Sequence, residues 1–295
     1  MKESLSSTLL ILLGVAAVAV SFMLIRPRPF TLNTKLASTA ELNTAAGSES
    51  KSRILAETHA TATAIYDPAP YTFIEVLDSC GPSFQGACVN MRSGPGVEYP
   101  SILHLRTGVV LKVAKIVIQN GTEWYKIQPD TDILYPERIV SDWYVAADMV
   151  RVFYDDGIHD AQKDGDAEYK TTKRIIVDIS DQMLYAYNGD ILFMQEPIST
   201  GLEFTPTPRG TFRVYKMTPS RYMQGPIVGV SDQVFDLPGV PWNLYFTYDG
   251  AVIHGAYWHD HFGEPWSHGC VNLPPQKAKE LYLWADMGTT VTVKE

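Results

Sequence analysis

The chain has 295 residues, 45% of them hydrophobic and 19% charged, which is enough for about two globular domains with apolar cores. Its formal net charge of -9 at pH 7 argues against a nucleic-acid partner, because phosphate binding relies on clustered Lys and Arg side chains.

Residues 1–25 are predicted to be an uncleaved, membrane-spanning signal anchor. Within them, residues 9–25 form an apolar run with one serine and no charge. A run of this length lies near the lower limit of about 17–25 residues for a spanning helix, and it exceeds the ~7–15 residues of a signal-peptide core. The alternative is cleavage at Ala17-Val18-Ala19, which would release a secreted protein.

Residues 26–69 are predicted to form a flexible stalk. Their composition shifts to Thr, Ala, Ser and Asn, with few large apolar side chains that could build a core. A random coil of this length spans roughly 35 Å on average, so it would hold folded domains away from a membrane. The alternative is an amphipathic helix at about residues 52–63.

Residues 70–154 are predicted to form a small all-β unit. Short runs rich in β-branched and aromatic residues alternate there with turn residues. These runs are TFIEVL, SILHL, VVLKVAKIVI, EWYKIQ and DWYVAA. With VNMRSGPGVEYP between them, they make the region similar to a bacterial SH3-like barrel, interrupted by an insertion at residues 131–138. The resemblance implies wall or peptide binding through exposed aromatic side chains such as Tyr99, Trp124, Tyr125, Trp143 and Tyr144. The alternative is that most of these aromatics fill the core.

The three cysteines are unevenly spaced. Cys80 and Cys88 flank a short loop rich in turn residues, whereas Cys270 stands alone. We predict a disulfide between Cys80 and Cys88, because disulfides persist in exported chains.

Residues 155–172 are predicted to be a solvated linker, since they are charged, contain glycine and show no periodicity. The following residues, 173–295, are predicted to form a β-rich domain with one principal helix. Asn188-Gly189 between two apolar runs is a strong hairpin signal. Apolar residues at helical spacing after Pro275 predict the helix. Further strands are predicted at residues 174–179, 211–215, 242–247, 251–254 and 289–294.

The segment 217–240 contains Gly225, Gly229 and Gly239 and is predicted to be an irregular loop. Long loops in compact domains are usually functional, so we expect it to form a lid or a wall of a binding site.

Residues 253–272 hold four of the seven histidines and Cys270. A thiol is a nucleophile only as the thiolate, and a cysteine with a pKa of about 8.5 is mostly protonated at neutral pH. A cysteine surrounded by histidines therefore indicates a nucleophile with a neighbouring base.

The same segment resembles the L,D-transpeptidase (YkuD-type) catalytic domain. His254-Gly255 followed by SHGCVN at residues 267–272 follows that family's signature, with a slightly short intervening loop. Upstream, RIIVDISDQMLYAYNGD, STG and TPTPRGTF occur in the family's order, so the resemblance covers about residues 173–295.

The resemblance implies a role for each matching residue. Cys270 would attack a peptide carbonyl and form a thioester. His254 would deprotonate the thiol and then protonate the leaving amine, with its ring oriented by the backbone carbonyl of Gly255. Backbone N–H groups of Gly269 and Cys270 would hold the oxyanion.

Other residues of the segment are expected to support these roles. His268 is an alternative base, but we assign it a supporting role because it can reach the sulfur only in a sharp turn. Ser267 and Asn272 are expected to form hydrogen bonds within the turn. Further candidates for the pocket lining are Tyr245, Trp258 and Arg209, of which Tyr245 and Trp258 could equally belong to the core.

The resemblance implies a peptidoglycan L,D-transpeptidase without metal or organic cofactor. A tetrapeptide stem would lose its terminal D-alanine, and an amine of a neighbouring stem would resolve the thioester into a 3→3 cross-link. Hydrolysis by water is the alternative. Arg26, Arg28 and Lys35 follow the apolar run and by the positive-inside rule favour a cytosolic C-terminal side. The implied substrate lies outside, so we expect the domains in the cell envelope.

Two other classes of function compete with this interpretation. The histidines, Asp260 and Cys270 are capable zinc ligands, although no familiar metalloenzyme spacing occurs. A degenerate wall-binding protein is the other alternative, and the intact His254-Gly255 and SHGC elements argue against it.

Overall fold

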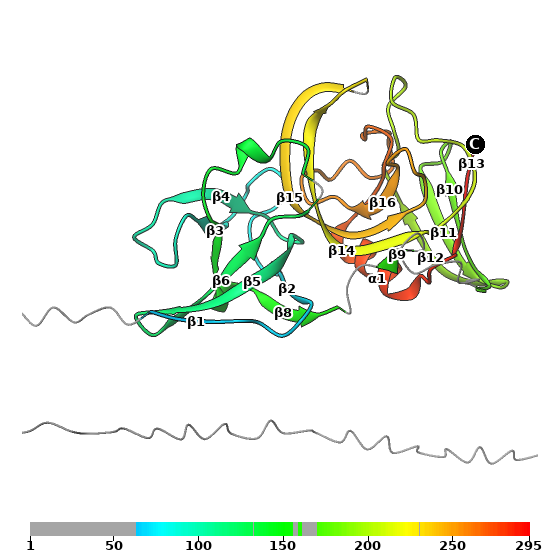
Figure 1. Ribbon diagram of the computed structural model, residues 1–295. Coiled ribbons are helices and arrows are strands. Elements are labelled where there is room, and N and C mark those ends of the chain that lie inside the picture. The colour runs from blue at the N-terminus through cyan, green and yellow to red at the C-terminus, as the bar shows by residue number, and fades with distance from the viewer. Residues whose placement is uncertain (1–62, 132, 156–158, 161–169, 230) are drawn as a thin grey trace, which may run out of the picture. The chain divides into compact units, whose positions relative to one another are not determined.

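The computed structural model describes residues 63–131, 133–155, 159–160, 170–229 and 231–295. The predicted membrane segment 1–25 and most of the predicted stalk lie outside these residues. In the described part, no helix combines the length and the apolar character needed to cross a membrane. The prediction of a mainly β chain with one principal helix is confirmed there (Figure 1).

The N-terminal half of the described chain forms one eight-stranded antiparallel sheet. Its first strand, β1, falls within the predicted stalk and pairs with β5. In sheet order the strands are β4 (Ser101–Leu105), β3 (Val89–Arg92), β7 (Tyr144–Ala146), β6 (Thr122–Gln128), β5 (Val110–Gln119), β2 (Thr72–Glu75) and β8 (Arg151–Tyr154), with β1 (Thr63–Tyr66) beside β5. Two short 3-10 helices, η1 (Pro136–Arg138) and η2 (Ala147–Met149), interrupt the connections.

Three aromatic residues of this sheet that were candidates for wall binding are buried. Trp124, Tyr125 and Trp143 are each at most 7% exposed. They are therefore core residues in the described structure, and the alternative interpretation of these aromatics holds for them.

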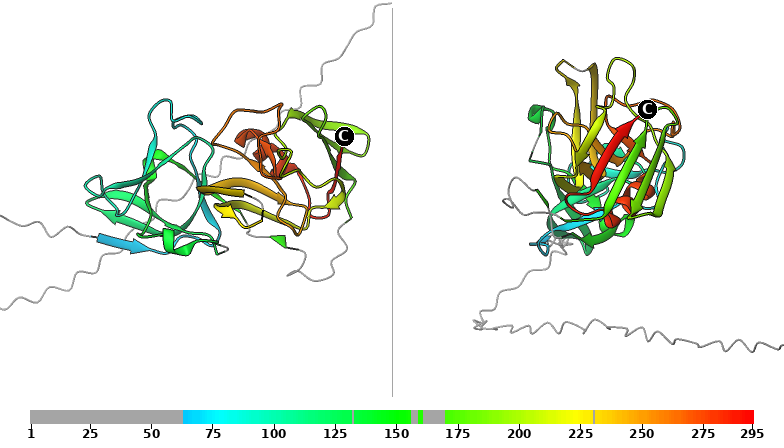
Figure 2. Two further views of the ribbon diagram at one scale, coloured as in Figure 1. Left: turned by 90° about the horizontal axis from the view of Figure 1, so that it is seen from above. Right: turned by 90° about the vertical axis from the view of Figure 1, so that its right-hand side faces the viewer.

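Two five-stranded sheets form the C-terminal half (Figures 1 and 2). The first has the order β12 (Ile191–Pro197), β11 (Met183–Asn188), β10 (Lys173–Asp178), β18 (Thr290–Lys294), β13 (Gly210–Arg213). The second has the order β17 (Val271–Leu273), β16 (Val252–Gly255), β15 (Ser231–Tyr245), β14 (Lys216–Ile227), β9 (His159–Asp160). In the right-hand view of Figure 2, red β18 runs between green strands, because the C-terminal strand pairs with both β10 and β13.

One apolar core joins the strands of both sheets to the helix α1 (Pro275–Trp284). Ile175 and Leu184 come from the first sheet, and Leu244 and Ile253 come from the second. The helix begins with proline at its first position, where the missing N–H has no intrahelical partner to lose. Leu281 of α1 packs into this core, and α1 contacts β15 and β16.

The prediction of an irregular loop at residues 217–240 is wrong. The segment instead belongs to β14 and β15, which form a long antiparallel hairpin (Figure 1). The register shifts between Arg221 and Met223 and again between Gly225 and Ile227. Such irregularities accommodate glycine and proline in a strand, so the glycines and prolines of this segment did not prevent strand pairing.

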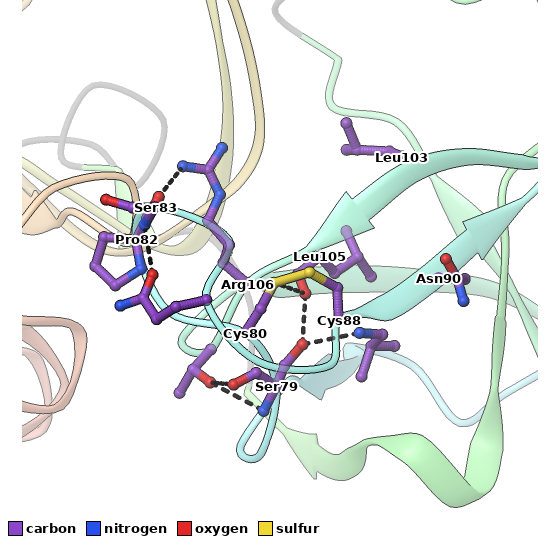
Figure 3. The surroundings of a disulfide bond; sticks show 12 residues. Ser79, Cys80, Pro82, Ser83, Cys88, Asn90, Leu103, Leu105 and Arg106 are labelled. Atoms are coloured by element: carbon purple, nitrogen blue, oxygen red, sulfur yellow. Dashed lines mark hydrogen bonds between the residues drawn. A yellow bond between two sulfur atoms is a disulfide. The ribbon is translucent and has the colours of Figure 1, made fainter.

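Cys80 and Cys88 form a disulfide, with Cα atoms 4.5 Å apart (Figure 3). The loop between them is further held by Arg106, whose guanidinium Nη1 donates to the Pro82 carbonyl at 3.1 Å. Ser79 Oγ accepts the Val89 N–H at 2.8 Å on the other side of the bond.

We expect one free thiol per chain under denaturing, non-reducing conditions, because only Cys270 is unpaired. Cys88→Ser is expected to lower the free energy of unfolding by about 2–3 kcal/mol, as the chain-entropy model predicts for a short loop. Thiol titration and urea unfolding measure the two quantities. Three thiols per unreduced chain would contradict the pairing.

Candidate active site

A cavity of about 1000 Å³ lies in the C-terminal half and includes both Cys270 and His254 in its lining. Its walls come from the turn before β17, from the β14–β15 hairpin and from the loops around residues 204–208 and 249–251. Residues 131, 133 and 134 of the predicted insertion complete one side.

Parallel pairing of β16 with β17 brings the candidate nucleophile and base to the same cavity. His254 pairs with Asn272, and Ile253 pairs with Val271. Cross-strand partners point to the same side of a sheet, and so do residues two apart along a strand. His254 and Asn272 therefore share a side, Cys270 directly precedes β17, and all three line the cavity.

The turn before Cys270 depends on a glycine and a serine. Gly269 has φ +113°, a backbone conformation that residues other than glycine rarely adopt. Ser267 Oγ accepts the Gly269 N–H at 3.1 Å and donates to the Cys270 carbonyl at 2.6 Å. The Gly269 N–H, which is expected to hold the oxyanion, is therefore bonded within the turn in this structure.

His254 is fully buried and its tautomer is determined by its neighbour. The Nδ1 atom lies 3.1 Å from the Gly255 carbonyl oxygen, which can only accept, so Nδ1 carries the hydrogen. Among the described residues Nε2 has no hydrogen-bond partner. Burial lowers the His254 pKa to about 3, and the charges of Arg221 and His259 act in the same direction. At neutral pH Nε2 therefore offers a lone pair.

The thiol of Cys270 is also held in its neutral form. Burial raises its pKa, while the Arg221 guanidinium and the Val252 N–H oppose this shift. A neutral thiol and a neutral imidazole in one cavity mean that the thiolate–imidazolium pair is not preformed.

The other histidines make structural contacts. His268 lines the cavity and stacks on Phe235 of β15, with ring centroids 6.2 Å apart and planes inclined by 6°. His259 is only 5% exposed, although it lies in a polar loop. Its Nδ1 accepts the His261 N–H at 3.2 Å, and its Nε2 lies 2.9 Å from the amide of Asn272. The His259 ring thus packs against the Asn272 side chain.

Within the described ranges, no three His, Cys, Asp or Glu side chains are grouped so that they could hold a metal ion. His261, one of the candidate ligands, stacks on Trp266 at 3.8 Å between centroids and has Nδ1 2.7 Å from Glu264 Oε1.

Of the three additional pocket candidates, only Trp258 lines the cavity, with its ring 5.7 Å from that of His254. Tyr245 and Arg209 lie elsewhere. The Tyr245 ring packs beneath the Arg221 guanidinium at 5.5 Å, because it occupies the end of β15 next to β14. Arg209 forms an ion pair with Glu295 at the C-terminal end.

Sequence reasoning missed Arg221, which lines the cavity from β14. It is the only charged residue between positions 217 and 231, and this isolation was the available signal.

The insertion at residues 131–138 is bound to the β14–β15 hairpin. The Tyr135 N–H donates to Gln224 Oε1 at 2.8 Å, and the Tyr135 hydroxyl donates to the Pro226 carbonyl at 2.6 Å. Arg138 Nη1 donates to the Gly225 carbonyl at 2.6 Å. These bonds connect the N-terminal sheet to the wall of the cavity.

We expect Arg138→Ala to speed amide hydrogen exchange in the outer part of the β14–β15 hairpin by about tenfold, because a hydrogen bond from a charged donor contributes about 1.5–3 kcal/mol. Arg92→Ala is the matched control, since the Arg92 side chain donates to the Val97 and Tyr99 carbonyls, at 3.3 and 2.7 Å, and among the described residues to no part of the β14–β15 hairpin. Equal exchange in both variants would show that the insertion does not restrain the hairpin.

Stability is expected to fall on acidification because of two buried histidines. Burial lowers the pKa of His254 to about 3 and that of His259 to about 4. Between these values and about 6.5, the unfolded chain binds protons that the folded chain does not. Each histidine then reduces the free energy of unfolding by up to about 1.4 kcal/mol per pH unit as pH falls below about 6.5.

Urea unfolding at pH 7, 6, 5 and 4.5 measures this dependence. His259→Gln removes one of the two groups, so its stability is expected to depend less steeply on pH than that of the unmodified protein. An unchanged slope would contradict the assignment.

Residues 172–293 match the model of the L,D-transpeptidase catalytic domain, YkuD. No curated protein sequence matches the chain. Among solved structures, a mutant L,D-transpeptidase of Enterococcus faecium is 27% identical, with 42% of this chain and 50% of that chain covered and a TM-score of 0.38. The chain thus spans about half the length of that protein.

Two mycobacterial structures are covered more fully. An L,D-transpeptidase from Mycobacterium smegmatis is 20% identical, with 59% of this chain and 91% of that chain covered and a TM-score of 0.40. One from Mycobacterium tuberculosis H37Rv is 17% identical, with 63% and 93% covered and a TM-score of 0.38.

Proposed function

Because residues 172–293 are an L,D-transpeptidase (YkuD) catalytic domain, we propose that the protein transfers acyl groups between peptidoglycan stem peptides through a thioester on Cys270. The observation that carries the proposal is the state of His254. Its Nδ1–H is directed to the Gly255 carbonyl, so Nε2 is the basic nitrogen, and His254 and Cys270 line the same cavity.

Acylation begins with transfer of the thiol proton to His254 Nε2 as the sulfur attacks the carbonyl of the third stem residue. The tetrahedral intermediate collapses with cleavage of the peptide bond. The imidazolium returns its proton to the leaving amine, and D-alanine departs. A thioester and a neutral histidine remain.

Transfer to the acceptor reverses these proton movements. A neutral amine from a second stem attacks the thioester carbonyl, and His254 Nε2 takes the proton that the amine loses. When the sulfur leaves, it recovers a proton from the imidazolium. The product is an amide between two third residues, and water in place of the amine gives a free acid instead.

Because its substrate is peptidoglycan, this activity belongs to the cell envelope. Anchoring by residues 1–25 and an orientation with the folded part outside the cytoplasmic membrane are parts of the same proposal.

A single experiment separates this mechanism from zinc-dependent hydrolysis. Metal-stripped protein is incubated with a tetrapeptide donor and excess acceptor amine, and the products are analysed by mass spectrometry. An acyl increment on the Cys270 peptide together with amide product supports the proposal. Activity that requires added zinc and yields only free acid would refute it, because a metal-bound hydroxide delivers oxygen directly to the carbonyl.

A further inference from the structure

Arg221 carries a charge into the cavity without an ionic partner in the described part of the chain. Its Nη1 atom is buried and lacks a hydrogen-bond acceptor there. The ion pairs formed between described residues do not include it. Its guanidinium lies 5.5 Å above the ring of Tyr245, a contact that orients the group but accepts no hydrogen bond from Nη1. A buried donor of a charged group left in this state destabilises the protein until an acceptor arrives.

The position of Arg221 relates this charge to the reacting groups. Its guanidinium charge adds to the lowering of the His254 pKa by burial and opposes the rise of the Cys270 pKa that burial causes, so the positive charge acts on the base and on the nucleophile. All three residues line the same cavity. Apart from histidine, the only other ionisable charged residue of the lining is Asp249, which is exposed. An anionic ligand in this cavity is therefore attracted mainly to Arg221.

We propose that Arg221 binds the free α-carboxylate of the residue that leaves during acylation, and so selects donors whose scissile bond is followed by a chain terminus. This inference rests on the proposed function. In that reaction, the nitrogen protonated by His254 is separated from the carboxylate carbon only by Cα. A group that holds the carboxylate must therefore line the same cavity as the base and the sulfur, and Arg221 does so.

Guanidinium and carboxylate are complementary in shape, because two parallel N–H donors match two oxygens. The same interaction discriminates between stems of different length. In a tetrapeptide the fourth residue ends in a carboxylate, whereas in a pentapeptide its carbonyl is part of a neutral amide. Arg221 would donate two charge-assisted hydrogen bonds to the first, but only one weaker hydrogen bond to the neutral carbonyl of the second.

The test measures binding without turnover. In a Cys270→Ala background, Kd is determined by calorimetry for a tetrapeptide donor and for the same peptide with a C-terminal carboxamide. We expect the free acid to bind at least about tenfold more tightly than the carboxamide, because a hydrogen bond to a charged group contributes that much affinity. Adding Arg221→Gln should bring the ratio of the two Kd values close to one, while Arg221→Lys should retain part of it.

Arg209→Gln is the matched control, because Arg209 pairs with Glu295 outside the cavity lining and should leave the ratio unchanged. A ratio of the two Kd values near one while Arg221 is present overturns the proposal, and so does a ratio that survives Arg221→Gln. Because binding is read in a variant without the thiol, failure of acyl transfer itself would be detected separately and would not alter this result.

A second measurement distinguishes carboxylate binding from an effect through the thiol. Alkylation of Cys270 by the neutral reagent iodoacetamide is followed against pH in the protein with and without Arg221→Gln. Loss of the guanidinium is expected to raise the thiol pKa modestly in both the presence and absence of donor. The proposal is overturned if Arg221→Gln slows acylation by the free-acid donor and by the carboxamide donor by the same factor, and if this factor equals the loss of thiolate. In that case Arg221 acts only on the sulfur.

Discussion

Cys270→Ala is expected to abolish acyl-enzyme formation, with a decrease in turnover of at least about 10⁴-fold, as removal of a nucleophile does in other acyl-transfer enzymes. No other cysteine can take over, because Cys80 and Cys88 are joined in a disulfide. Intact-protein mass spectrometry after incubation with a tetrapeptide donor, or with a carbapenem-type β-lactam that acylates the same thiol, should show no added mass.

Cys270→Ser is expected to be nearly inactive as well. A hydroxyl is a far weaker acid than a thiol, and one neutral imidazole with a pKa of about 3 is a weak base for it. The variants should retain the thermal unfolding midpoint of the unmodified protein to within a few degrees, since Cys270 is only partly buried. Residual acylation in Cys270→Ala would mean that another group is the nucleophile.

His254→Ala is expected to slow acylation by about 10²–10⁴-fold, the usual contribution of a general base. His268→Ala should have a much smaller effect, because the His268 ring stacks on Phe235 and supports the cavity wall. Single-turnover acylation, followed by mass spectrometry, measures both rates. The reverse order of effects would make His268 the base.

The pH dependence of acylation adds a check on His254. Since burial lowers its pKa to about 3, the base stays unprotonated down to that pH. The acylation rate should therefore show no acid limb near the ordinary histidine value of about 6.5. The limb that appears at higher pH should report Cys270, whose pKa is raised by burial. His254→Ala can lose stability, so its unfolding curve is recorded beside the kinetics.

Much of the fold follows from local sequence. Pro275 and the apolar spacing after it predict the helix, which the structure places at Pro275–Trp284. The Asn188-Gly189 pair predicts the hairpin of β11 and β12. The three-residue strand β17 escaped prediction because so short a run carries no periodicity.

The β14–β15 hairpin shows where local patterns are insufficient. Its glycines and prolines indicate an irregular loop, but tertiary pairing absorbs them at register shifts. His259 is a similar case. A histidine in a polar loop is normally exposed, whereas here the fold packs it behind Asn272 and the surrounding protein buries it.

The sequence by itself indicated the similarity of residues 172–293 to the L,D-transpeptidase domain, the mainly β class and the set of residues around Cys270, because these depend on short, ordered motifs. Only the tertiary structure decided which of those residues line one cavity. It also decided that the Ser267 hydroxyl accepts the Gly269 N–H and that Arg221 lines the same cavity. The reason is physical. Whether a side chain is buried, paired or left without a partner depends on segments that are distant in the chain, and no local pattern records their contacts.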